Sequence, residues 1–128
     1  MALTPKTILV VEDDLDSRQA LCLILETLGH TPVSFETAKE GLAALSSNKI
    51  DVAMLDVMLP GMNGYELMAE IKKIPALAEV PIIMVTARDE DSEIWRGYQS
   101  GADYYITKPY TARQIDYGLR LFFEKQEE

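Results

Sequence analysis

Three short runs of consecutive apolar residues constrain the fold of this chain more than any other feature. They cover residues 8–11, 52–55 and 82–85. Each run is too short for a buried helix, and none alternates with polar residues as a half-exposed strand does. Continuous apolar strands are typical of a parallel sheet that helices cover on both faces. The runs therefore predict the central strands of such a sheet.

The stretches between these runs carry helical spacing, so strands and helices alternate along the chain. Strands are expected at residues 6–11, 31–35, 52–55, 82–85 and 103–107. Helices are expected at residues 15–28, 38–45, 64–71 and 112–123, after the capping residues Asp14, Thr37, Asn63 and Thr111. A further short helix is expected between the candidate caps Asp91 and Ser92 and the closing Gly101. Alternation of this kind predicts a parallel sheet with right-handed crossovers.

The expected fold class is α/β, a flavodoxin-like, doubly wound, five-stranded parallel sheet with five helices. Its strand order, 2-1-3-4-5, is taken from known folds of this type. The two strands of mixed composition should be the edges, as Pro32 in the second of the five strands suggests. A chain of 128 residues holds one core and is too short for two. We expect a single domain over residues 1–128, with its core at about 6–125.

Composition narrows the classes of partner. The formal net charge of −9 argues against direct nucleic-acid contact by this domain, because such contact rests on clustered Lys and Arg. The single cysteine, Cys22, cannot form an internal disulfide and suits a reducing compartment. No apolar stretch approaches the length of a transmembrane span, and residues 1–6 lack a signal peptide's apolar region. We therefore expect a cytoplasmic protein without membrane contact.

Charged and polar residues follow the predicted strands at the points where each strand ends. Glu12 and Asp13 follow the first strand, Asp56 the third, Thr86 the fourth and Lys108 the fifth. The carboxyl ends of parallel strands meet at one edge of a sheet, so we expect these side chains to share a cleft. Two like charges about 4 Å apart repel by about 4 kcal/mol at an effective dielectric near 20, which a bound cation would relieve.

The residue types indicate which cation and which chemistry such a cleft would serve. Oxygen ligands favour Mg²⁺, or Mn²⁺, over zinc, and the chain has one histidine and no second cysteine. An aspartate nucleophile, a divalent cation, a lysine and a hydroxyl suit phosphoryl transfer to the aspartate. Taken singly, strand-end acids often cap helices, Thr86 is an ordinary helix-entry hydroxyl, and Lys108 is an ordinary surface lysine. Their joint spacing favours the functional interpretation.

Four segments together resemble the response-regulator receiver family of two-component signalling, which includes chemotaxis regulators. They are residues 8–14 (ILVVEDD), 54–64 (MLDVMLPGMNG), 85–87 (VTA) and 101–109 (GADYYITKP). The resemblance extends over about residues 6–125 and implies that Asp56 accepts a phosphoryl group from a histidine kinase or phosphotransfer protein. It also implies that Asp13, Asp56 and the backbone carbonyl of Met58 bind Mg²⁺ directly, with Glu12 reaching the cation through water.

The same resemblance implies the parts of a switch. Thr86 matches the hydroxyl that moves to the phosphoryl group, and Lys108 matches the ammonium that pairs with it. Tyr105 matches the aromatic residue that swings inward when Thr86 moves. The bond between Lys108 and Pro109 matches the cis peptide of the family. These roles imply that phosphorylation controls an output domain or partner protein.

The resemblance places a set of residues toward solvent on the face built from the fourth helix, fifth strand and fifth helix. They are Ile94, Tyr98, Tyr105, Gly118 and Leu121. Glycine within a helix is unfavourable by about 0.5–1 kcal/mol relative to alanine, so Gly118 suggests close approach by a neighbour. We interpret the set as a surface for a partner or a phosphorylation-dependent homodimer. The alternative is ordinary surface variation, because single exposed apolar residues are common.

Three other functions compete with this interpretation. A Mg²⁺-dependent aspartyl-phosphate phosphatase of the haloacid-dehalogenase type would carry a second aspartate where Met58 stands. A nucleotide-binding flavodoxin-like module would need a glycine-rich phosphate loop, which the sequence lacks. A phosphorylation-independent adaptor would not require the acceptor site to be intact. We therefore expect no enzyme activity on outside substrates, and slow self-dephosphorylation because Met58 and Arg88 overhang the site.

Overall fold

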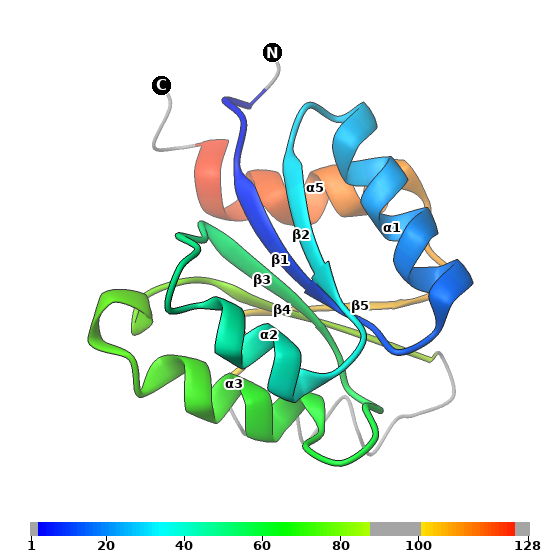
Figure 1. Ribbon diagram of the computed structural model, residues 1–128. Coiled ribbons are helices and arrows are strands. Elements are labelled where there is room, and N and C mark those ends of the chain that lie inside the picture. Colours follow the sequence, from blue (N-terminus) through cyan, green and yellow to red (C-terminus); the bar gives the residue numbers. More distant parts are fainter. Residues whose placement is uncertain (1–2, 88–100, 125–128) are drawn as a thin grey trace.

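The computed structural model describes residues 3–87 and 101–124 as one parallel sheet with helices on both sides (Figure 1). The strands are β1 (Thr7–Val11), β2 (Thr31–Phe35), β3 (Val52–Asp56), β4 (Ile82–Ala87) and β5 (Tyr104–Lys108). Their order is β2-β1-β3-β4-β5, and every neighbouring pair is parallel. The predicted strand order is confirmed, and the three apolar runs form the central strands.

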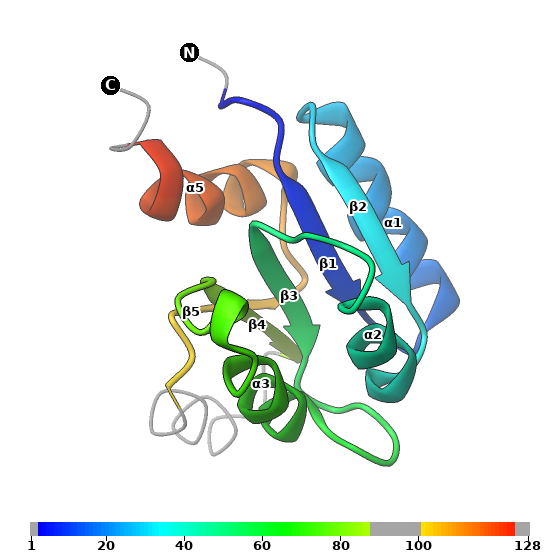
Figure 2. The same cartoon turned by 60° about the vertical axis from the view of Figure 1, so that its left-hand side comes forward.

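Helices cover both faces of the sheet. They are α1 (Leu15–Thr27), α2 (Ala38–Ala44), α3 (Gly64–Lys72) and α5 (Ala112–Phe123), with a short 3-10 helix η1 (Pro75–Leu77). The helices α1 and α5 lie on one face, and α2 and α3 lie on the other, as Figure 2 shows from a second side. The described residues thus contain four α-helices where the sequence predicted five. The other predicted helix, between Ser92 and Gly101, lies outside the described residues.

The core explains why the central strands are apolar throughout. Side chains alternate between the two faces along each strand, so Ile8 and Val10 pack beneath α1 and α5. Leu9 and Val11 pack with the residues of α2 and α3. Every residue of β3 is buried, including Asp56 at its carboxyl end. A strand buried on both faces leaves its last residue on a rigid support.

Side-chain caps set where the helices begin. The Asp14 carboxylate accepts a hydrogen bond from the Ser17 amide at 2.8 Å, which starts α1 immediately after the acidic residues that follow β1. Asn63 and Glu66 form a reciprocal capping box at the start of α3, and α5 begins with the same arrangement. These caps confirm the predicted helix starts. The Asp14 carboxylate is therefore engaged in capping.

Gly64, the first residue of α3, lies against the backbone at the end of β3. Its amide donates a hydrogen bond to the Val57 carbonyl at 3.1 Å. A Cβ atom added at Gly64 would collide with the Asp56 carbonyl oxygen and would lie 3.0 Å from the Cα of Val57. Only glycine permits so close an approach. The contact fixes α3 directly against the backbone of Asp56.

We expect Gly64→Ala to lower the free energy of unfolding by about 1–3 kcal/mol, because the added methyl group meets backbone atoms that cannot rotate away. Gly118→Ala in α5 is the matched control, because its added Cβ meets mainly the Tyr104 ring, at 3.3 Å, which can shift. Urea denaturation of both variants measures the difference. Equal stabilities for Gly64→Ala and the wild type would contradict the proposed close packing.

Candidate functional site

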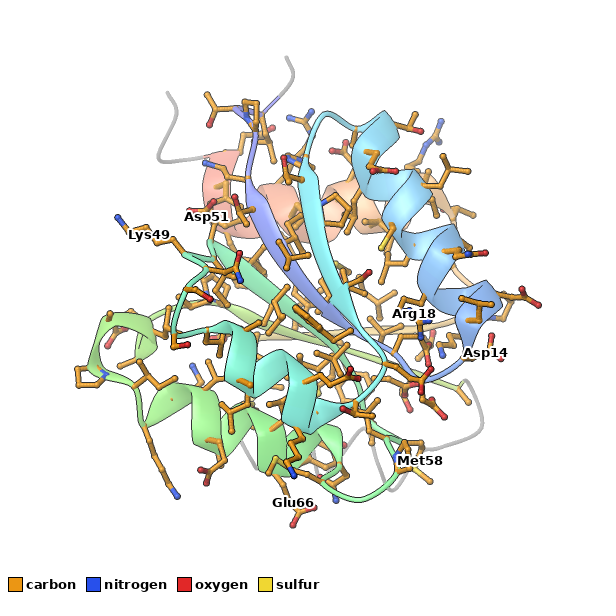
Figure 3. The ribbon with its side chains drawn as sticks, in the orientation of Figure 1. Asp14, Arg18, Lys49, Asp51, Met58 and Glu66 are labelled. Carbon is orange, nitrogen blue, oxygen red and sulfur yellow. The ribbon has the colours of Figure 1, made fainter. Side chains whose placement is uncertain are left out.

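The candidate site lies at the end of the sheet where the strands have their carboxyl ends. Figure 3 shows Asp14, Arg18 and Met58 together at this end, whereas Lys49 and Asp51 lie at the other end. The alternation of strands and helices in a parallel sheet brings these strand ends to one edge. This is the edge at which the sequence predicted the cluster of charged residues.

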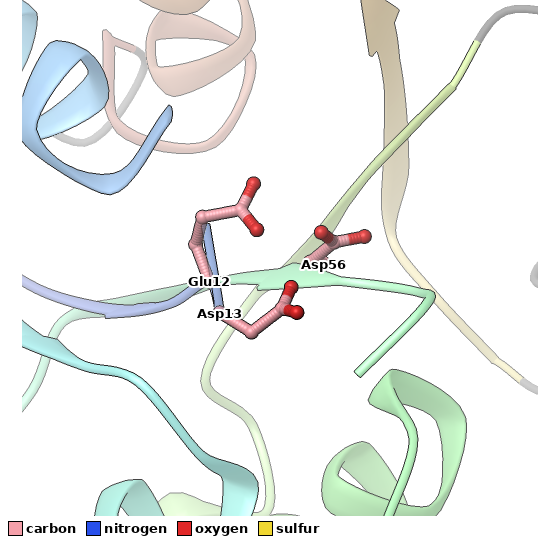
Figure 4. Close-up of side chains that lie close together, drawn as sticks. All are labelled: Glu12, Asp13 and Asp56. Atoms are coloured by element: carbon pink, nitrogen blue, oxygen red, sulfur yellow. The ribbon is translucent and has the colours of Figure 1, made fainter. Parts of the chain in front are cut away.

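Three carboxylates converge there, as Figure 4 shows for Glu12, Asp13 and Asp56. One oxygen from each residue lies within 4.8 Å of the others. Glu12 and Asp56 are buried, whereas Asp13 is exposed, so the cluster opens to solvent on one side. Three carboxylates at this spacing suit a hard divalent cation such as Mg²⁺ or Mn²⁺. The predicted acidic cluster is therefore present.

Lys108, the last residue of β5, offsets part of this negative charge. Its Nζ atom lies 2.6 Å from Glu12 Oε1 and 3.4 Å from Asp56 Oδ2. Burial alone lowers the pKa of Lys108, but the hydrogen bond with Glu12 and the charge of Asp56 outweigh burial, so the pKa is raised. The ammonium stays charged and bridges the two buried carboxylates.

Burial disfavours the charged form of Glu12. Burial, followed by the adjoining Asp56 carboxyl group, raises its pKa to about 7, although the hydrogen bond with Lys108 opposes this rise. Its second oxygen accepts a hydrogen bond from the Asp14 amide at 3.2 Å. Glu12 therefore forms a direct ion pair with Lys108. The sequence predicted for Glu12 only the binding of a cation through water.

The carboxylate of Asp56 is held in one orientation by two donors. Its Oδ1 atom accepts a hydrogen bond from the Met58 amide at 3.0 Å, and Oδ2 faces Lys108. The Met58 side chain is 57% exposed at the rim of the site. Arg88, the other residue expected to overhang the site, lies outside the described residues. The arrangement leaves Asp56 oriented between a backbone amide and an ammonium.

Thr86 is buried near the carboxyl end of β4, whereas Tyr105 is buried near the start of β5. Thr86 has no exposed surface, and within residues 3–87 and 101–124 its hydroxyl has no hydrogen-bond partner. The Tyr105 hydroxyl lies 3.0 Å from the Tyr65 hydroxyl, which belongs to α3. Thr86 is therefore close to the carboxyl end of the sheet, whereas Tyr105 lies further back along β5 and packs in the core.

The solvent-facing set predicted on the β5 and α5 side needs two corrections. Tyr105 is only 8% exposed, because β5 is covered on both faces and Tyr105 packs in the core with α3. Gly118 is buried too, because α5 turns it toward the ring of Tyr104. Leu121 is 50% exposed, as predicted. Ile94 and Tyr98 lie outside the described residues.

Two residues of the site were not found from the sequence. Arg18, on α1, donates a hydrogen bond from Nη1 to the Glu12 carbonyl at 2.8 Å and so braces the end of β1. The only sequence signal for it is a basic residue one turn into a helix that follows an acidic strand end. Tyr65 gave no such signal, because it meets Tyr105 across 40 residues of chain.

The peptide bond between Lys108 and Pro109 is cis, as predicted. Among the helices formed by residues 3–87 and 101–124, none has the length and apolar composition needed to cross a membrane.

Comparison with known proteins agrees with this geometry. The family model described as "Response regulator receiver domain" matches residues 8–120. The phosphate regulon transcriptional regulatory protein PhoB of Pseudomonas aeruginosa is 37% identical over 110 residues, which are 86% of this chain and 48% of that protein. The chain thus spans about half the length of the curated relatives it matches.

Solved structures give the same assignment. The CheY-like response regulator receiver domain protein of Methanospirillum hungatei JF-1 has a TM-score of 0.85 and 31% identity, covering 97% of this chain and 98% of that one. The BeF3-activated DrrB receiver domain has a TM-score of 0.81 and 30% identity, covering 93% and 97%. The chain therefore belongs to the response regulator receiver domain family, the signalling domains of two-component systems.

Proposed function

We propose that Asp56 accepts a phosphoryl group from a histidine kinase or phosphotransfer protein, and that the modified domain then controls an output domain or a partner protein. The observation that carries this proposal is the setting of the Asp56 carboxylate. It lies between the Met58 amide and the Lys108 ammonium, with Glu12 and Asp13 beside it. The contacts orient the Asp56 carboxylate for attack on phosphorus, and the Lys108 ammonium is placed where it can pair with the phosphoryl oxygens.

The acidic cluster would hold Mg²⁺, or Mn²⁺, during the transfer. Asp13, Asp56 and the backbone carbonyl of Met58 would bind the cation directly, with Glu12 as a ligand through water. The residues fit such a cation because they offer oxygen atoms within 4.8 Å of one another and carry more negative charge than Lys108 offsets. Bound Mg²⁺ supplies neutralisation of the charge on the phosphoryl oxygens.

In the transfer itself, an oxygen of Asp56 attacks phosphorus and forms a new oxygen–phosphorus bond. The bond from phosphorus to the donor breaks, and its electron pair leaves with the donor. Lys108 then exchanges part of its contact with Glu12 for a phosphoryl oxygen, because it already lies 3.4 Å from Asp56 Oδ2. The domain acts on itself and needs no outside substrate beyond the phosphoryl donor.

The phosphoryl group also offers the acceptor that the Thr86 hydroxyl lacks among the described residues. A buried hydroxyl without a partner is unfavourable, so a new phosphoryl oxygen draws Thr86 toward Asp56. Tyr105 fills the space that Thr86 leaves, and the β5 and α5 side of the domain changes with it. Signalling then depends on the difference in contact energy between the two states.

The wider context of the domain is also a proposal. Residues 1–128 would form one receiver domain that acts in the cytoplasm, without membrane or direct nucleic-acid contact. Its output would come through a fused effector domain, a separate protein or a phosphorylation-dependent homodimer. The exposed Leu121 of α5 supports a contact surface on that side.

We expect Asp56→Asn to abolish phosphorylation by acetyl phosphate in the presence of Mg²⁺, because the neutral amide replaces the negatively charged carboxylate oxygen that attacks phosphorus. Intact-mass spectrometry measures the added phosphoryl group directly. Asp16→Asn, at an exposed aspartate of α1, is the matched control and should be labelled like the wild type. Equal labelling of Asp56→Asn and the wild type would exclude Asp56 as the acceptor.

Without Mg²⁺, we expect Lys108→Met to lower the free energy of unfolding by about 1–3 kcal/mol relative to the wild type, because two buried carboxylates lose their counter-charge. Added Mg²⁺ should stabilise this variant more than it stabilises the wild type. Urea denaturation with EDTA or with Mg²⁺ measures both effects. Lys73→Met, at an exposed lysine of the α3 end, serves as the control. If Mg²⁺ raised the free energy of unfolding equally in Lys108→Met and in the wild type, the result would argue against a cation at the acidic cluster.

We expect Thr86→Val to raise the free energy of unfolding by about 1 kcal/mol, because it replaces a buried hydroxyl that lacks a partner among residues 3–87 and 101–124 with a methyl group. The same variant should lose the response of the Tyr105 ring to phosphorylation. Denaturation and ring NMR signals of tyrosine measure the two effects. A loss of stability on this substitution would mean that the Thr86 hydroxyl is already satisfied.

A further inference from the structure

A pair of buried tyrosines, Tyr65 and Tyr105, links helix α3 to strand β5. The hydroxyl oxygens of Tyr65 and Tyr105 lie 3.0 Å apart, and either one can donate the hydrogen bond. The two residues are 7% and 8% exposed. A buried hydroxyl strongly favours a conformation that satisfies it, so each ring restricts the orientation of the other.

Tyr65 is tied to the phosphoryl-acceptor strand by its position in α3. It follows Gly64, whose amide donates to the Val57 carbonyl at 3.1 Å. Gly64 also lies so close to the Asp56 carbonyl that no Cβ atom fits between them. A shift of the backbone around Asp56 therefore moves the start of α3, and the Tyr65 ring with it.

Tyr105 is tied to the Thr86 position by the sheet. In the β4 and β5 pairing, Tyr105 is opposite Met84 and Thr107 is opposite Thr86. Residues two apart in a strand point to the same face, so Tyr105 lies diagonally beside Thr86 on the side that α3 covers. The hydroxyl pair thus joins the two elements that must respond together when Asp56 is modified.

We propose that Tyr65 is a positioning residue, which holds Tyr105 in its buried orientation and so couples the backbone at Asp56 to the switch. This inference rests on the proposed function, in which the buried orientation of Tyr105 accompanies phosphorylation. The hydrogen bond with Tyr65 raises the population of that orientation before any phosphoryl group arrives. The phosphorylated state then forms more readily, because Tyr105 already occupies the orientation that this state requires.

The size of the effect follows from the net worth of one buried hydrogen bond. Such a bond changes a population ratio by about two- to tenfold. Linkage requires that a ligand which favours the buried orientation loses affinity by up to the same factor when the bond is removed. Beryllofluoride, added together with Mg²⁺, is a suitable ligand, because the similar DrrB receiver domain is described as activated by BeF3.

The test is a double-mutant cycle read out as the affinity for Mg²⁺ and beryllofluoride. The proteins are the wild type, Tyr65→Phe, Tyr105→Phe, the double variant and Tyr117→Phe, a control that removes an exposed hydroxyl from α5. We expect Tyr65→Phe to bind about two- to tenfold more weakly than the wild type. The double variant should bind like Tyr105→Phe alone, and Tyr117→Phe should bind like the wild type.

A second readout separates positioning from general stability. Ring NMR signals of Tyr105, with a soluble paramagnetic probe, should show greater exposure of that ring in Tyr65→Phe. Unchanged affinity and unchanged exposure of Tyr105 in Tyr65→Phe, in a wild-type protein that does bind beryllofluoride, would overturn the positioning role alone. Additive effects in the cycle would overturn it as well. Failure of the wild type to bind beryllofluoride would overturn the proposed function and this inference with it.

Discussion

The dominant constraint on the site is the electrostatic repulsion among three carboxylates that the parallel sheet holds close together. Glu12, Asp13 and Asp56 offer oxygen atoms within 4.8 Å of one another, and two of these residues are buried. Like charges at about 4 Å repel by about 4 kcal/mol at an effective dielectric near 20, so the fold and the Lys108 ammonium together must hold the carboxylates in place. The fully buried β3 and the tight contact at Gly64 supply that constraint.

This repulsion explains how the site can respond to a single chemical event. Lys108 offsets part of the negative charge, and burial still raises the pKa of Glu12 to about 7. Under the proposed function, a cation or a phosphoryl group would change this balance and redistribute the contacts of Lys108. Thr86 lies near the carboxyl end of β4 and Tyr105 lies diagonally beside it on β5, so under the proposed function a change in charge at Asp56 would reach Tyr105 through Thr86.

Most of the fold and the acidic cluster could be predicted from the sequence because both follow from local patterns. Continuous apolar runs identify strands covered on two faces, and the parallel arrangement then brings Glu12, Asp56 and Lys108 together. The orientations of Tyr105 and Gly118 were predicted wrongly, because both faces of β5 are covered and α5 turns Gly118 toward Tyr104. Tyr65 was missed because a contact across 40 residues leaves no local signal.

The central claim is that one divalent cation binds among the three carboxylates. A crystal structure of the wild-type protein with Mn²⁺, phased to locate the metal by its anomalous scattering, tests this claim most directly. We expect one strong peak in contact with Asp13 and Asp56, with Lys108 displaced from its closest approach to Glu12. A peak at another place, or no peak at this end of the sheet under saturating Mn²⁺, would contradict the account.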